Sequence, residues 1–319
     1  MASARVCNYR FRILKPIGRS KGKSAVGSAA YISRSKLKDE ESGKSYDYRK
    51  GHSEPLLSKI YAPDKAPEWV KDRNALWNNV QNKESRKNSQ FARSFQINLP
   101  HQLSIEEMKC LLDDYIKENF TDSGMVADVA LHAPDEGSDP RNFHAHVLLT
   151  LRGLDDSGFV GNKVREWNDT ELFNTWRKNL ALMCSKRLEK AGFYNEANQW
   201  KHGYLTLPQQ RIKAIQRGDL EYVNACNHEP SEHKGMQIHH MEKRGVESEV
   251  EKRRKAEQLE KSKIDADFLK RFKHLLPAKT KVGDTISLKR KQSLEKIEKE
   301  VMEQLKKREL DTDDRTRDR

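Results

Sequence analysis

The stretch that decides the fold is residues 124–152, GMVADVALHAPDEGSDPRNFHAHVLLTLR. Apolar side chains dominate Met125–His132 and Phe143–Arg152, and each run predicts a strand. Between them lies APDEGSDPRN, a run rich in Asp, Gly and Pro that predicts a turn-rich loop. Two strands around such a loop favour an antiparallel hairpin.

Three histidines are carried by this predicted hairpin. His144 and His146 are two positions apart on the second strand, so their side chains leave the same face. His132 ends the first strand and reaches that face if the strands pair, and Asp128 shares its parity as a candidate partner for a ligating histidine. Three imidazoles without a cysteine form an open metal site that leaves positions for substrate or water. These residues alone leave a metal site and a chance grouping of histidines about equally open.

The segments around the hairpin alternate between strand and helix patterns. Strands are predicted over residues 5–15 and 91–99. Helices are predicted over residues 25–37, 69–87, 104–120, 171–191 and 208–218. The third of these opens with the capping box of Ser104 and Glu107. Residues 39–67, rich in Gly, Ser, Asp and Pro, predict a long surface loop.

Charge divides the chain into two parts. The 319 residues carry a formal net charge of +13, and residues 246–319 contain 22 basic and 17 acidic side chains. Residues 1–245 keep a net charge of +8 and all five Trp, so they can bury a core. We therefore expect a domain at 1–245 and a charged helical tail at 246–319 that is partly disordered.

Several classes of protein are excluded by simple patterns. No run of about 18 apolar residues occurs, so membrane insertion is not expected. The N-terminal residues MASARVCNYRFRILK lack the apolar stretch of a secretory signal. The four cysteines form no CxxC pair, which argues against a zinc ribbon or a disulfide framework and fits a reducing cytoplasm.

A candidate nucleophile and a rejected phosphate loop lie near the N-terminus. Tyr31, in SAAYISR, can attack only if a metal or a base activates its phenol, and by itself it is better explained by packing. Gly18, Gly22 and Lys23 resemble a phosphate loop, but three residues separate the glycines where four are required. We therefore reject an ATPase, while Lys23 could still contact a DNA phosphate.

Basic side chains near aromatic ones are further candidates for DNA contacts: Arg86, Lys87 and Arg93 around Phe91, and Arg165 beside Trp167. In this interpretation Phe91 stacks on a base. The alternative, a solvated helix end beside a buried aromatic side chain, is equally favoured.

Taken in order, several segments resemble the relaxase domain of the MobA/MobL family of plasmid mobilisation proteins, including the N-terminal relaxase part of Ti-plasmid TraA-like proteins. The resemblance covers about residues 5–245. The matching segments are SAAYISRSKL at 28–37, NSQFARSFQINLPHQLS at 88–104, the hairpin at 124–152, REWN at 165–168, HGYLTLPQQ at 202–210 and MEKRG at 241–245.

The resemblance implies an HUH endonuclease. It implies an α+β fold in which a central antiparallel sheet is flanked by helices on one side, with the tyrosine helix over a metal. By similarity, Tyr31 matches the catalytic tyrosine, and His132, His144 and His146 match the metal ligands. The implied reaction nicks and rejoins one strand at a plasmid origin of transfer through a 5′-phosphotyrosine. The implied cofactor is a divalent ion, Mn²⁺ or Mg²⁺, and three imidazoles favour Mn²⁺.

The same resemblance implies partners and one departure. It implies single-stranded DNA, accessory mobilisation proteins and the coupling protein of a type IV secretion system as partners, in a bacterial cytoplasm, with export attached to the transferred DNA. Relatives often carry acidic residues where this chain has Ser94 and Gln96. Two alternatives stay open: an HUH replication initiator or transposase, and a non-catalytic single-stranded DNA-binding protein.

Overall fold

The computed structural model describes residues 7–50, 53–226, 244–245 and 252. The chain divides into two compact units, one of Cys7–Tyr204 and one of Met1–Val6 with Leu205–Arg319. Of the second unit, the described helices are α6 (Leu207–Arg217), as expected from the sequence, and α7 (Leu220–Ala225). The expected tail at 246–319, residue 252 excepted, lies outside the described residues.

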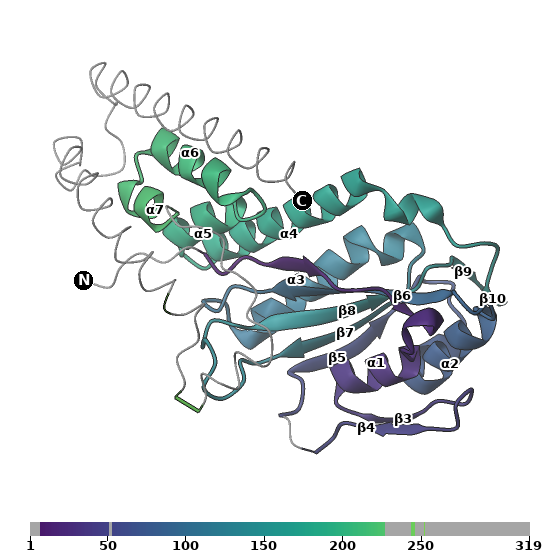
Figure 1. The fold of residues 1–319 in the computed structure, drawn as a ribbon. Helices are drawn as coiled ribbons and strands as arrows, with labels where there is room; N and C mark the ends of the chain where they lie inside the picture. Colours follow the sequence, from purple (N-terminus) through teal and green to yellow (C-terminus); the bar gives the residue numbers. More distant parts are fainter. Residues whose placement is uncertain (1–6, 51–52, 227–243, 246–251, 253–319) are drawn as a thin grey trace, which may run out of the picture. The chain divides into compact units, whose positions relative to one another are not determined.

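A central antiparallel sheet organises the first unit (Figure 1). Its strand order is β1 (Phe11–Ile13), β6 (Gln90–Asn98), β8 (His144–Leu149), β7 (Ala127–His132) and β5 (Leu57–Tyr61), and β2 (Ile17–Gly18) also pairs with β6. The predicted hairpin is confirmed, because β7 and β8 pair antiparallel with His132 opposite His144. The α+β fold with a central antiparallel sheet and flanking helices is confirmed as well.

Helices cover both faces of this sheet, so the expectation of helices on one side was wrong. One core lies between the sheet and α3 (Ile105–Asn119), α4 (Thr170–Lys190) and α5 (Tyr194–Lys201). A second core lies between the other face and α1 (Ala25–Ser33) and α2 (Arg73–Lys83). The reason is visible in β7, where residues of both parities are buried, so the strand has no solvated face.

The predicted loop at 39–67 contains strands. Within it, β4 (Ser45–Asp47) pairs with β3 (Lys36–Lys38), and β5 forms one edge of the central sheet by pairing with β7. An edge strand needs only one apolar face and one partner, so its polar sequence LSKIY resembles a loop. The helix predicted at 25–37 ends at Ser33, where the chain turns into β3.

Shorter elements complete the unit. They are the 3₁₀ turns η1 (Arg19–Lys21), η2 (Glu68–Lys71), η3 (Thr121–Ser123) and η4 (Arg165–Asn168), and the strands β9 (Leu154–Asp155) and β10 (Gly158–Phe159). The predicted capping box at the start of α3 is confirmed, because Ser104 and Glu107 exchange hydrogen bonds. Among the helices that the structure describes, no segment has both the length and the apolar character needed to cross a bilayer.

Candidate active site

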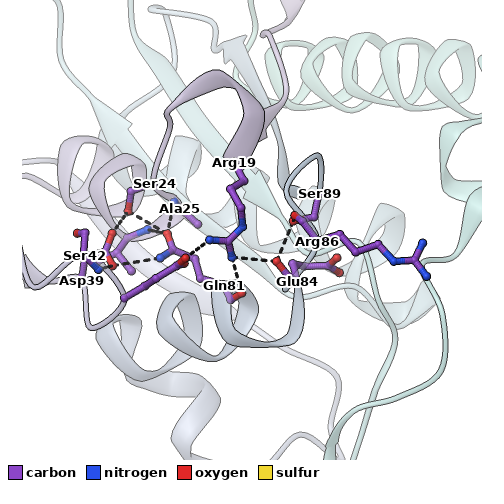
Figure 2. A network of polar contacts seen from close by, with 11 residues as sticks. Arg19, Ser24, Ala25, Asp39, Ser42, Gln81, Glu84, Arg86 and Ser89 are labelled. Carbon is purple, nitrogen blue, oxygen red and sulfur yellow. Dashed lines mark hydrogen bonds and ion pairs between the residues drawn. The ribbon is translucent and has the colours of Figure 1, made fainter.

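A polar network fixes the start of α1 against α2 (Figure 2). The side-chain oxygen of Gln81, on α2, accepts hydrogen bonds from the backbone N–H of Ala25 at 2.6 Å and from the hydroxyl of Ser24 at 2.9 Å. Asp39, which is 2% exposed, lies within 2.7 Å of the same hydroxyl and accepts from the Gln81 amide at 3.2 Å. Protein groups therefore occupy the first amides of α1, in agreement with the rejection of a phosphate loop.

The network continues beside η1. Arg19 donates to the backbone carbonyl of Glu84 at 3.0 Å, and Ser89 donates to the same carbonyl at 2.8 Å. Ser89 also donates to the carbonyl of Arg86, whose own side chain is exposed (Figure 2). The end of α2 and the start of β6 are thereby linked to the loop that precedes α1.

Tyr31 lies on the solvent side of α1, near its end. The neighbours Ala30 and Ile32 are buried, whereas Tyr31 is 43% exposed. Its ring centroid lies 6.4 Å from that of His146 and 5.4 Å from that of Tyr48, edge to face in both cases. The phenol therefore stands beside the histidine-bearing face of the sheet.

The structure brings the three histidines together on the face that α1 covers. The ring centroids of His132 and His144 are 5.6 Å apart, those of His132 and His146 are 5.4 Å apart, and those of His144 and His146 are 5.3 Å apart. Pairing of β7 with β8 produces this cluster, because His132 lies directly opposite His144.

Backbone carbonyls orient two of the rings. Nε2 of His132 donates to the carbonyl of Ile32 at 2.9 Å, and Nδ1 of His144 donates to the carbonyl of Asn142 at 2.8 Å. A carbonyl only accepts, so the bonded nitrogen carries the proton and the other nitrogen keeps a free lone pair. Metal-binding histidines are commonly oriented in this way. The first bond also joins the sheet to the last turn of the helix that carries Tyr31.

The environment keeps His132 and His146 neutral. Burial, with the neighbouring His144 and the positive charge of Arg34, lowers the pKa of His132 to about 4. Burial, with both other histidines and Arg34, lowers the pKa of His146 to about 3. A neutral imidazole is the form that binds a metal ion.

The spacing of the rings fits a divalent ion. A point equidistant from the three centroids lies about 3.1 Å from each. An ion bound at 2.0–2.1 Å from nitrogen lies roughly 3.2 Å from the ring centre. The ring nitrogens themselves are not arranged to hold an ion together, and no group of three such side chains is so arranged among the described residues. No hydrogen bond in that part of the chain holds the ring of His146, which packs edge to face against Tyr31, His132 and His144.

An unpartnered oxygen lies beside this cluster. Asn98, on β6, is directly opposite His144 and is fully buried. Its amide donates to the side chain of Asn142 at 3.3 Å, but its Oδ1 has no hydrogen-bond partner among the described residues. Sequence reasoning missed Asn98, although it shares the parity of Ser94 and Gln96. Gln96 is half-buried and lies opposite His146.

Asp128 has a different role from the one predicted. It lies on the histidine face and is fully buried, but its carboxylate accepts from Arg73 at 2.9 Å and from the indole N–H of Trp77 at 2.8 Å. Both partners belong to α2. Asp128 therefore anchors α2 to the sheet, and backbone carbonyls orient the histidines in its place.

Lys23 lies beside Tyr31, the candidate nucleophile. It is exposed and lines a hollow of about 380 Å³ next to Tyr31. The hollow is lined by Leu14, Lys15, Ile17, Gly22, Lys23, Ser24, Gly27, Ser28, Tyr31, Ile32, Tyr46, Tyr48, Ser94, His146 and Leu148. Of the other candidates, Arg86 and Lys87 are exposed before β6, and Arg165 is exposed in η4.

The DNA contact predicted for Arg93 was wrong. Arg93 is 7% exposed and lies on the opposite face of the sheet, where its guanidinium packs 5.3 Å from the ring centroid of Phe173 and bonds to Asn168. Phe91 is buried under Arg19 and cannot stack on a base. The alternative of a buried aromatic side chain is therefore the correct one.

Comparisons with known proteins indicate the family of this chain. The MobA/MobL family model matches residues 23–244. The conjugal transfer protein TraA of Rhizobium radiobacter is 35% identical over 158 residues, which cover 46% of this chain and 14% of TraA. The mobilization protein MobL of Acidithiobacillus ferridurans is 34% identical over 177 residues, which cover 48% of this chain and 45% of MobL. The chain thus spans less than half the length of these two curated relatives.

A solved structure is similar as well. It comes from work on the molecular basis of vancomycin resistance transfer in Staphylococcus aureus, and it is 35% identical with a TM-score of 0.53. The match covers 58% of this chain and 94% of that one. The family match covers more than two thirds of this chain and includes α1, the central strands and the histidine hairpin. The predicted resemblance is therefore confirmed, and the chain belongs to the MobA/MobL family.

Proposed function

We propose that this protein is a mobilisation relaxase that cuts and rejoins one DNA strand at a plasmid origin of transfer. The observation that carries the proposal is the position of Tyr31, an exposed phenol beside three histidines that share one face of the sheet. Membership of the MobA/MobL family supports the assignment to mobilisation rather than to replication or transposition.

In this proposal His132, His144 and His146 hold a divalent ion. When bound, that ion supplies positive charge to the non-bridging oxygens of the scissile phosphate. The chain contributes three imidazoles, two of which are oriented by the carbonyls of Ile32 and Asn142. Three nitrogen ligands favour Mn²⁺ over Mg²⁺.

Tyr31 carries the covalent step. Its phenol loses a proton, its oxygen forms a bond to phosphorus, and the bond from phosphorus to the 3′-oxygen breaks. The departing oxygen takes up a proton and becomes a free 3′-OH, while the 5′-phosphate stays on Tyr31. One phosphodiester is exchanged for another, so the strand can be rejoined without ATP.

The hollow beside Tyr31 suits a single strand. Lys15 and Lys23 are exposed at its wall and can contact phosphates, and Tyr46 offers an aromatic ring to a base. We expect this binding to weaken as salt rises, because it depends on phosphate contacts.

The test uses the full chain, Mn²⁺ and labelled single-stranded oligonucleotides tiled across the DNA that flanks its gene. A protein–DNA band that survives denaturation, and is lost in Tyr31→Phe, supports the proposal. Tyr48→Phe is the matched control because it removes the neighbouring phenol; loss of the band only there assigns the nucleophile to Tyr48. His144→Ala should abolish the band and spare binding. Binding without any covalent band would identify a non-catalytic DNA-binding protein.

A further inference from the structure

Arg34, the residue that ends α1, has an unusual backbone conformation. Its φ is +51° and its ψ is +40°, and it is the one non-glycine residue with positive φ among those described. Helices often end with a residue in this left-handed conformation, and glycine is usual there because a Cβ atom makes it unfavourable. A strained residue that keeps a long side chain points to a function for that side chain.

The side chain of Arg34 lies over the candidate nucleophile. Its guanidinium carbon is 4.8 Å from the centre of the Tyr31 ring. Two of its nitrogens, Nε and Nη1, are buried without a hydrogen-bond partner in the part of the chain that the structure describes. A buried guanidinium N–H is normally paired, so these two donors require a partner that the described residues do not supply.

The Tyr31 ring connects Arg34 with the histidine cluster. The guanidinium carbon of Arg34 is 4.8 Å from the centre of that ring, and the ring centroid lies 6.4 Å from that of His146. A phosphate bound between the phenol and the histidines would therefore lie close to Arg34.

We propose that Arg34 binds a non-bridging oxygen of the scissile phosphate and is a catalytic residue of the relaxase reaction. The inference rests on the function proposed above and assigns a further residue to it. A guanidinium binds phosphate oxygens through charge-assisted N–H bonds, and Nε and Nη1 of Arg34 are two donors without a partner among the described residues. Charge develops on these oxygens as Tyr31 attacks, and a fixed cation stabilises it.

The first test compares Arg34→Gly with Arg34→Ala. Both variants remove the guanidinium, so both should slow formation of the Tyr31–DNA adduct under single-turnover conditions by about 100-fold. Only glycine suits the backbone, so the Gly variant should melt at a higher temperature than the Ala variant. Lys36→Ala removes an exposed charge two residues further on and is the control that keeps the rate. A wild-type rate in both Arg34 variants would overturn the proposal.

The second test asks whether Arg34 acts on the phosphate itself. A methylphosphonate at the scissile position removes one charged oxygen, and it should slow the wild-type chain much more than Arg34→Gly. Equal slowing of both would mean that Arg34 only orients the Tyr31 ring, and would overturn the proposal.

Calorimetry with Mn²⁺ alone tests whether the loss of Arg34 slows the reaction indirectly, by weakening metal binding. We expect equal affinity in the wild-type chain and in Arg34→Gly. Weaker binding, with the rate restored by excess Mn²⁺, would overturn the proposal. Absence of an adduct in the wild-type chain would refute the relaxase function together with the role of Arg34, whereas a normal adduct in Arg34→Gly would refute that role alone.

Discussion

Substitution of Gln81 by Met should loosen the helix that carries Tyr31. Met keeps the length of the side chain but removes the oxygen that accepts from Ala25 and Ser24, and the amide that donates to Asp39. Ala25 is fully buried and Asp39 is 2% exposed, so water does not replace the lost bonds readily. The substitution leaves buried polar groups without one of their partners.

The expected loss of stability follows from the buried polar groups that lose a hydrogen-bond partner. An unsatisfied buried N–H costs about 1–3 kcal/mol, and a hydrogen bond to a charged group contributes about 1.5–3 kcal/mol. Asp39 keeps its bonds to Ser24 and to the backbone of Ser42, which lessens its share. We therefore expect a loss of about 3 kcal/mol. For a unit of this size, the melting temperature should fall by about 6–12 °C.

The assay is thermal and urea denaturation of the full chain, followed by single-turnover adduct formation. Asn82→Ala is the matched control, because Asn82 is the exposed neighbour on the same helix, and surface changes usually stay within about 0.5 kcal/mol. We expect Gln81→Met to slow the adduct more than it weakens oligonucleotide binding. A fall in melting temperature below about 2 °C, with an unchanged rate, would refute the idea that Gln81 holds α1 in place.

Four further predictions concern the histidines, Asn98 and two basic residues. In metal-free buffer, the free energy of unfolding should fall as pH drops from about 6.5 to about 4. In this range His132 and His146 bind protons in the unfolded chain but stay neutral in the folded one, because folding lowers their pKa. Urea titrations test this, and a His146→Gln variant with the same slope would contradict it. Asn98→Ala should lower Mn²⁺ affinity by about 10-fold in calorimetry; unchanged affinity would exclude Asn98 from the metal site. Lys23→Ala should reduce the salt dependence of oligonucleotide binding by about one unit of slope. Arg93→Met should leave that slope unchanged and lower stability, and the reverse pattern would contradict both assignments.

The sequence predicted the histidine cluster because its geometry is local. His132 and His144 belong to adjacent strands joined by a short loop, and alternation along a strand decides which face each side chain takes. The same parity argument placed Asp128 on the correct face. It did not predict the partners of Asp128, since Arg73 and Trp77 lie on a helix more than 50 positions earlier.

Long-range packing also explains the other errors. Arg93 was predicted to contact DNA because basic residues precede it in the sequence. In the structure Phe173, on α4, packs against its guanidinium, and Asn168 accepts a hydrogen bond from it. Strand β5 was not predicted because its own sequence is polar. The strand is formed by pairing with β7, which lies about 70 positions further along the chain. Local patterns gave no information on either contact.

Contacts at both ends of α1 fix the position of Tyr31. Gln81 holds the first turn, and the carbonyl of Ile32, in the last turn, accepts the proton of His132. Because that bond uses Nε2, the Nδ1 lone pair of His132 is the one available to an ion. An ion bound there leaves the helix bond intact, so loading of the site does not require α1 to move. The ring of His146, for which the described residues show no hydrogen bond, is then the one histidine that would have to turn to complete the proposed metal site, while Tyr31 stays in place.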